Sequence, residues 1–163
     1  AIGLLDHGFS PVQLAGYTAT LANDGARMQL HLVKQVTTYG FEEVVEETQP
    51  RVADQVPAGK EVFQVVREGM VAASRPGGTS AASWLDFPYT VASKTGPPES
   101  LDNLTSPYIC YMPPEDPEIA IAVVIEDGGQ GYTGAPVARK MADQYFFGGL
   151  GAEQVTAPGT LLP

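Results

Sequence analysis

The sequence predicts an α+β fold in which helices pack against an antiparallel sheet. Three strand-like runs, 89–95, 107–112 and 119–126, follow one another, and helical patterns stand before and after them rather than between the last two. The turn 113–117 is too short for a crossover, so the last two strands should be antiparallel. With 163 residues, 44% of them apolar, the chain is large enough for one domain with a core.

The first helix is predicted to begin after Ser10. Ser10 can cap the helix, Pro11 suits the first helical position, and Gln13 completes a capping box. The helix should end at 23–25, because Gly25 tolerates the left-handed conformation of a C-terminal cap. Its apolar side chains are Val12, Leu14, Ala15, Ala19, Leu21 and Ala22.

A β-hairpin is predicted to follow. Residues 30–37 alternate as a strand does, Tyr39-Gly40 provides the turn, and 41–47 returns as a second strand with its glutamates partly in solvent. The segment 48–57 contains two prolines and is predicted to be a loop.

Two further helices are predicted, at 60–73 and 135–147. The first should bury Val62, Val65, Val66 and Met70, which recur at helical spacing, and the residues 74–78 should stop it. Trp84 and Phe87 are expected to pack in the loop that follows. We expect residues 148–163 to form a flexible tail, and the whole chain, 1–163, to be one part of a domain in a longer protein.

Composition excludes several classes of function. The net charge is −10 and no basic patch is present, so neither nucleic acid nor an anionic membrane surface is an expected partner. Cys110 is the only cysteine, which we interpret as a buried inert thiol, and with His7 and His31 as the only histidines we predict no metal site and no cofactor. No apolar run reaches the roughly 20 residues of a membrane helix.

The first candidate site is Ser93-Lys94-Thr95-Gly96. Lysine and glycine are both depleted in strands, and a glycine there often marks the close approach of a ligand or of another backbone. A lysine beside it supplies a fixed positive charge for an anionic ligand. Taken alone, the motif is weak, and an ordinary strand end explains it better than a ligand site does.

The surrounding sequence resembles the penicillin-binding protein transpeptidase family, with three segments in the family's order. Ile2-Gly3, 10–15 and 21–25, followed by 31–34, resemble the helix that precedes the family's hairpin and the strand that begins it. Residues 91–96 (VASKTG) resemble its Lys-Thr-Gly strand. Residues 117–126, then a glycine-rich segment and 135–140, resemble its last strand and last helix. The likeness implies a partial β-lactamase/transpeptidase-like fold.

The resemblance also implies a chemistry. In this family a serine attacks the D-Ala-D-Ala end of a peptidoglycan stem peptide, an amine from a second stem resolves the acyl-enzyme, and β-lactams acylate the same serine. By position, Lys94 is the catalytic residue that holds positive potential over the site and supports proton transfer. Thr95 is expected to bind the substrate carboxylate, and Gly96 to let the substrate lie along the strand edge.

Two departures from the family stand out. No serine here precedes a lysine by three residues, so the nucleophile and the Ser-x-Asn motif would have to come from the upstream part of the same domain. Ser93 is no substitute, because neighbouring side chains on a strand point to opposite faces. Pro97, which we count among the substrate-binding positions, replaces a residue whose backbone N–H the family uses in its oxyanion hole. Proline has no N–H, and losing one such donor costs about 10²–10³ in rate.

Two other patterns are interpreted as structural. The run 129–134 matches G-x-G-x-x-G, but a dinucleotide site would need a parallel strand after the following helix, so we favour a mobile loop beside the site. Glu42, Glu43, Glu46 and Glu47 are interpreted as a solvated face rather than a cation site. The aromatic run 145–147 is expected to pack at the end of its helix.

Three functions are compatible with these patterns. The chain can be the C-terminal portion of a D,D-transpeptidase that acts on the outer side of the bacterial cell membrane, with stem peptide or a β-lactam as its ligand. Alternatively, it can belong to a degenerate domain that binds without turnover, which Pro97 favours, or to a β-lactam sensor.

Overall fold

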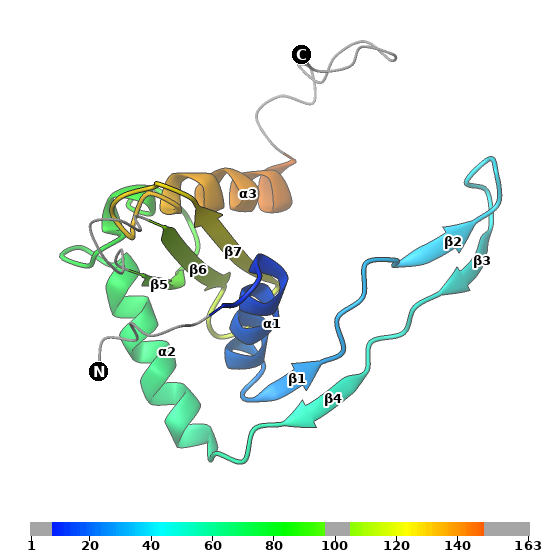
Figure 1. Ribbon diagram of the computed structural model, residues 1–163, viewed down its shortest axis with the longest axis horizontal. Helices are drawn as coiled ribbons and strands as arrows, with labels where there is room; N and C mark the ends of the chain where they lie inside the picture. The colour runs from blue at the N-terminus through cyan, green and yellow to red at the C-terminus, as the bar shows by residue number, and fades with distance from the viewer. Residues whose placement is uncertain (1–7, 97–104, 149–163) are drawn as a thin grey trace, which may run out of the picture.

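The structure is a computed structural model that describes residues 8–96 and 105–148 (Figure 1). The described strands of its main sheet are β5 (Ala92–Thr95), β6 (Ser106–Met112) and β7 (Ile119–Ile125), in the order β5-β6-β7, with both pairs antiparallel. Helices cover this sheet on both faces. The predicted α+β fold with an antiparallel sheet is therefore confirmed, and the three predicted strands lie within three residues of their expected bounds.

The central strand β6 serves two hydrophobic cores, because its side chains alternate between the faces of the sheet. Tyr108, Cys110 and Met112 point into a core with Trp84 and with the helix α3 (Ala135–Phe147). Tyr111 and Ile109 point to the opposite face. Their core contains residues of α1 (Pro11–Ala22) and α2 (Lys60–Ser74), namely Leu21, Ala22, Met70 and Val71.

Helix α1 begins and ends as predicted. The backbone N–H of Gln13 donates to Ser10 Oγ over 3.4 Å, and the N–H of Ser10 donates to Gln13 Oε1 over 2.9 Å, so both halves of the capping box are formed. After Asn23, which caps the C-terminus, Gly25 has a φ of +90°. A Cβ at Gly25 would lie 2.6 Å from the ring of Phe63, so glycine is required there both by conformation and by space.

Helix α2 has the predicted bounds to within one residue, and Met70 is buried as predicted, but the prediction that Val62, Val65 and Val66 are buried is wrong. Phe63, Met70 and Val71 are buried, whereas Val65 is 68% exposed and Val62 49% exposed. The chain folds the other side of the helix inward because Phe63 packs on Gly25 and because Arg67 binds Asp24 Oδ1 at 2.5 Å. Helical spacing alone could not choose between these two stripes.

The predicted hairpin exists, although it is part of a longer two-stranded ribbon. Strand β2 (Gln35–Thr37) pairs antiparallel with β3 (Val44–Glu47), so the hairpin is confirmed but the predicted first strand, 30–37, is too long. Strand β1 (Ala26–Met28) pairs with β4 (Val52–Gln55), which lies in the segment predicted to be a loop; that prediction is wrong. These short strands carry no apolar alternation, and they are stabilised by a partner about 25–30 residues away.

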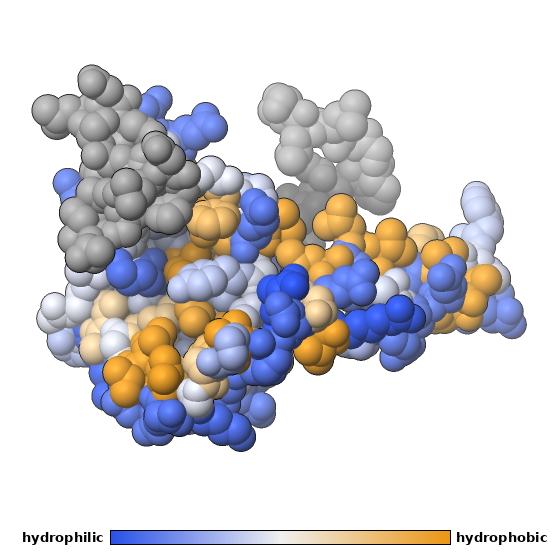
Figure 2. Space-filling model, turned by 60° about the horizontal axis from the view of Figure 1, so that its bottom comes forward, coloured by the Kyte–Doolittle hydropathy of each residue, from blue (hydrophilic) through white to orange (hydrophobic). Residues whose placement is uncertain are grey.

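The ribbon extends away from the sheet and its helices (Figure 1), and apolar side chains stand beside hydrophilic ones along its surface (Figure 2). Its most exposed apolar residues are Leu32, Tyr39 and Phe41. The four glutamates at 42, 43, 46 and 47 are exposed too, and within residues 8–96 and 105–148 none of them forms an ion pair.

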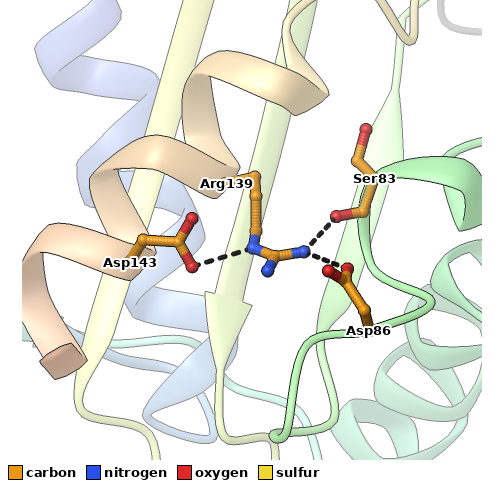
Figure 3. Close-up of polar contacts among 4 residues, drawn as sticks. All are labelled: Ser83, Asp86, Arg139 and Asp143. Carbon is orange, nitrogen blue, oxygen red and sulfur yellow. Dashed lines mark hydrogen bonds and ion pairs between the residues drawn. The ribbon is translucent and has the colours of Figure 1, made fainter. Parts of the chain in front are cut away.

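Arg139 joins α3 to the 3₁₀ helix η1 (Ala81–Ser83) and to the segment that follows it. Its guanidinium donates to Asp143 Oδ1 at 2.9 Å, to Asp86 Oδ1 at 2.6 Å and to the carbonyl oxygen of Ser83 at 3.0 Å (Figure 3). It also lies 5.0 Å from the centroid of the Phe87 ring, within the range of a cation–π contact. One side chain thus joins two segments that are more than fifty residues apart.

The two carboxylates that bind Arg139 should contribute unequally to stability. The side chain of Asp143 is 20% exposed and that of Asp86 is 81% exposed, and solvent weakens an exposed pair. We expect Asp143→Asn to lower the free energy of unfolding by about 1 kcal/mol, and Asp86→Asn to lower it less. Urea unfolding at pH 7 measures both, and an equal or larger effect of Asp86→Asn would contradict the prediction.

The same experiment repeated in acid tests the electrostatic cause. The hydrogen bond from Arg139 lowers the pKa of the Asp86 carboxyl below its ordinary value of 3.8. Its contribution to stability is therefore complete above that value and is lost as the pH falls through the lowered, folded-state pKa. The difference between the protein and its Asp86→Asn variant should accordingly disappear in strong acid.

Candidate functional site

Lys94, Thr95 and Gly96 lie at the end of β5, which is the outer strand of the sheet within the described residues. Lys94 is exposed and stands opposite Ile109, so its side chain is on the face that α1 and α2 cover. Ser93 is completely buried on the other face. The predicted alternation of Ser93 and Lys94 is confirmed, and Ser93 could not act on a substrate bound at Lys94.

The amine of Lys94 is held locally but is not neutralised. Lys94 Nζ donates to the carbonyl oxygen of Thr95. Within the described part of the chain it forms no ion pair with a carboxylate. A positive charge on an exposed strand end, without a fixed counterion there, is suited to an anionic ligand.

The hydroxyl of Thr95 lies on the opposite side of the strand from Lys94. Its Oγ1 is 3.3 Å from Thr79 Oγ1, where either atom can donate. Thr79 follows the turn after α2, and nothing in the sequence marked it as a neighbour of this site. Only one of the two hydroxyls donates within this pair, so the other O–H is left to donate a hydrogen bond to a carboxylate.

Gly96 is required by the packing of the protein itself. Its N–H donates to the carbonyl oxygen of Pro107 at 2.8 Å, and a Cβ at this position would lie 2.5 Å from Pro107 Cγ. The backbone of Gly131 approaches Gly96 from another direction. The expected close approach to this glycine is therefore observed, and it is made by the neighbouring strand and by the 127–134 segment.

Pro97, the position predicted to affect the oxyanion hole, lies outside the described residues. The roles of Lys94, Thr95, Gly96 and Pro97 accordingly remain predictions. The tail beyond Gly148 also lies outside the described residues.

A buried network of hydroxyl groups holds β5 in place. Ser93 Oγ lies 2.7 Å from Ser74 Oγ at the end of α2 and 2.8 Å from Ser80 Oγ. Close by, Trp84 Nε1 donates to the hydroxyl of Tyr108 over 2.9 Å. Burial raises the pKa of Tyr108 to about 12, so its hydroxyl stays protonated and can donate in turn. This network fixes the strand that carries Lys94.

Sequence reasoning missed this network. Ser74, Ser80 and Ser93 are separated by turns and come together only in the folded chain. The one local signal is Ser93 itself, a hydroxyl at a position that strand alternation buries, where it must find a partner.

Cys110 is completely buried, and its burial raises the pKa of the thiol. The predicted burial of this thiol is confirmed, and a raised pKa disfavours the reactive thiolate. Among the residues that the structure describes, no three His, Cys, Asp or Glu side chains gather where they could hold a metal ion. No helix in that part of the chain is both long enough and apolar enough to cross a membrane.

The glycine-rich segment 127–134 lies beside Gly96, because a Cβ built on Gly131 would lie against the Gly96 backbone; its expected mobility remains a prediction. The aromatic run at the end of α3 packs as expected: Phe146 and Phe147 contact the rings of Phe87 and Tyr89.

A surface pocket of about 220 Å³ lies at the other end of this region, before β5 begins. Its walls include Arg75, Trp84 and Tyr89, and Lys94 is not among them. This pocket is thus separate from the strand edge at Gly96 where the substrate is expected, and that expectation remains a prediction.

The sequence of this chain is similar to those of several known proteins. The model of the penicillin binding protein transpeptidase domain family matches residues 1–146. Penicillin-binding protein 2A of Bacillus subtilis is 32% identical over 166 residues, which is 90% of this chain and 23% of that protein. The peptidoglycan D,D-transpeptidase PbpA of Mycolicibacterium smegmatis is 31% identical over 162 residues, which is 85% of this chain and 30% of that protein.

A solved structure agrees with these matches. The imipenem acyl-enzyme complex of penicillin-binding protein A from M. tuberculosis superposes with a TM-score of 0.71 and 27% identity, over 85% of this chain and 31% of that one. The chain therefore spans between 23% and 31% of the length of these three proteins.

Proposed function

Because the chain belongs to the penicillin-binding protein transpeptidase family, we propose that it is the C-terminal part of a peptidoglycan D,D-transpeptidase domain and forms one wall of its active site. The observation that carries this proposal is the strand end itself. An exposed lysine without a carboxylate partner in the described chain stands two residues before a glycine, on the outer strand of the sheet.

The chemistry of this wall follows from its groups. An extended stem peptide or a β-lactam would lie, as an added strand, along the edge of β5 that no described strand pairs with. Lys94 would attract the negative charge of the ligand and support proton transfer from the attacking serine, while Thr95 would bind the terminal carboxylate. Gly96 would keep the end of the wall free of side-chain bulk.

The attacking serine would come from the upstream part of the same domain. No Ser-x-x-Lys occurs in these 163 residues. Lys94 is on the face of the sheet that α1 and α2 cover, so the partner that brings the serine would approach on that face. The exposed valines of α2 offer apolar area for such a contact. The complete protein would act on the outer side of the bacterial cell membrane, where peptidoglycan is.

A second function, binding without turnover, is favoured by Pro97. A proline directly after the Lys-Thr-Gly motif cannot donate a backbone hydrogen bond to an oxyanion. If no other donor replaces it, the domain would bind stem peptide, a partner protein or a β-lactam with slow acylation or none. A sensor that acylates but does not cross-link is the intermediate case.

Labelling with penicillin tests these functions on the full-length protein that contains this chain. An active transpeptidase should be acylated by a fluorescent penicillin in a one-to-one ratio within minutes, and it should cross-link stem peptides. Acylation without cross-linking would identify a sensor, and the absence of both would identify a binding domain. Replacing Pro97 by threonine restores the missing N–H, so faster acylation of this variant would show that the proline limits the rate.

A further inference from the structure

The glycine-rich segment 127–134 packs against the residue that follows β5, with Gly131 next to the backbone of Gly96. A Cβ built on Gly131 would lie 2.7 Å from the carbonyl carbon of Gly96 and 3.1 Å from its nitrogen, and closer still to its oxygen. Carbon atoms in ordinary contact are about 3.5–4.0 Å apart, so a methyl group here would force the two backbones apart by roughly 1 Å. A residue with a side chain at position 131 could therefore not make this contact, whereas a side chain at position 96 would meet Pro107 instead.

The segment cannot simply retreat from that contact, because it is held at the neighbouring residue. Ser106 Oγ donates to the carbonyl oxygen of Gln130 at 2.6 Å, and Thr133 donates to the same oxygen from Oγ1 at 2.7 Å and from its N–H at 2.9 Å. Ser106 is completely buried at the start of β6. The bond from Ser106 ties the segment to the sheet, and the two bonds from Thr133 make the turn around Gln130 rigid.

Strand β6 forms hydrogen bonds both to the 127–134 segment and to Gly96. Ser106 binds the segment, and the next residue, Pro107, accepts the hydrogen bond from the N–H of Gly96. Gly96 therefore has the ring of Pro107 on one side and the backbone of Gly131 on another. Because no free space separates these groups, a shift of Gly131 toward the sheet would also move the backbone of Gly96.

We propose that Gly131, held in place by Ser106, is a positioning residue that sets the location of Gly96 and of the substrate-binding edge of β5. This rests on the proposed function, in which that edge binds the stem peptide or β-lactam. Gly131 does not touch the ligand in this arrangement; it acts through Gly96. A misplacement of about 1 Å in a catalytic site can cost about 100-fold in rate.

The chain offers a matched control in the same segment. Gly129 has a φ of +73° and no atom within 4 Å of a Cβ built on it. Gly129→Ala therefore strains the segment without contact to Gly96, whereas Gly131→Ala displaces Gly96. Ser106→Ala removes one of the three hydrogen bonds and leaves the contact between the glycines.

The experiment measures acylation of the full-length protein by labelled penicillin over a range of concentrations. Gly131→Ala should lower the limiting acylation rate about 100-fold, with a smaller change in the concentration for half-saturation. Gly129→Ala should stay within about threefold of the unmodified protein, and Ser106→Ala should fall between the two. Equal losses in Gly129→Ala and Gly131→Ala that follow their melting temperatures would overturn the proposal.

Hydrogen exchange gives a readout that does not depend on acylation. In Gly131→Ala, peptides that cover 92–96 should exchange at least about tenfold faster, because the bond from Gly96 to Pro107 is disturbed; in Gly129→Ala they should not. Unchanged exchange in Gly131→Ala would overturn the proposal even if acylation fell. If the unmodified protein is never acylated, the transpeptidase function fails, and the exchange result still decides whether Gly131 positions Gly96.

Discussion

Lys94→Ala should slow the acylation of the full-length protein by labelled penicillin by about 10²–10⁴-fold. In the proposed function the amine provides both positive potential for the ligand carboxylate and support for proton transfer. The amine is exposed and forms no ion pair with a described carboxylate, so its loss should leave the fold unchanged, within about 0.5 kcal/mol. Stopped-flow or gel-based labelling with the penicillin measures the rate.

Two control variants show whether the effect is specific to Lys94 and whether it depends on the charge of Lys94. Lys140→Ala removes an exposed lysine from α3 and should acylate at the unmodified rate. Lys94→Arg keeps the charge but cannot give up a proton near neutral pH, so it should recover ligand binding more than acylation rate. Acylation of Lys94→Ala within about threefold of the unmodified protein would show that the wall formed by β5 does not act in the reaction.

Trp84→Ala should destabilise the protein by about 3–5 kcal/mol, the largest effect on stability that we expect from one side chain. Trp84 is 5% exposed, packs edge-to-face on Phe87 at 5.3 Å, and donates to Tyr108. Its removal leaves a cavity in the core between α3 and the sheet. It also takes a hydrogen bond from Tyr108, whose hydroxyl lies next to the serine network that holds β5.

Trp84→Phe separates the two causes, because it keeps most of the apolar volume and removes only the indole N–H. It should cost about 1–2 kcal/mol. The neighbouring Leu85 is 68% exposed, so Leu85→Ala should change the free energy of unfolding by less than about 0.5 kcal/mol. Chemical denaturation followed by circular dichroism compares all three variants, and a loss below 1 kcal/mol in Trp84→Ala would contradict this account of the core.

The elements that the sequence predicted well are those specified by neighbouring residues. Ser10, Pro11 and Gln13 determine the start of α1 within a single turn, and Gly25 determines its end, so these bounds needed no knowledge of the rest of the fold. The Lys94–Gly96 motif was also readable locally, because lysine and glycine are unusual together in a strand. Within the described residues β5 is an outer strand of the sheet, and the role of its motif in binding remains a prediction.

The features that were missed depend on residues far apart in the sequence. Strands β1 and β4 are stabilised by each other and not by their own patterns. The burial of Phe63 in place of Val65 is decided by the space that Gly25 leaves. The contact between Gly131 and Gly96 also requires the folded sheet. Pattern and spacing gave the identity of the motif, but they could not give the side chains that hold it.

The division of β6 between two cores has a consequence for errors in folding. A shift of this strand by one residue would send Tyr108, Cys110 and Met112 toward α1 and α2, and Tyr111 toward α3, so both interiors would be filled with the wrong side chains at once. A misaligned β6 would therefore lose packing energy in both cores. Lys94 is paired opposite Ile109 of this strand. The packing that fixes the register of β6 therefore also keeps the Lys94 side chain on its face of the sheet.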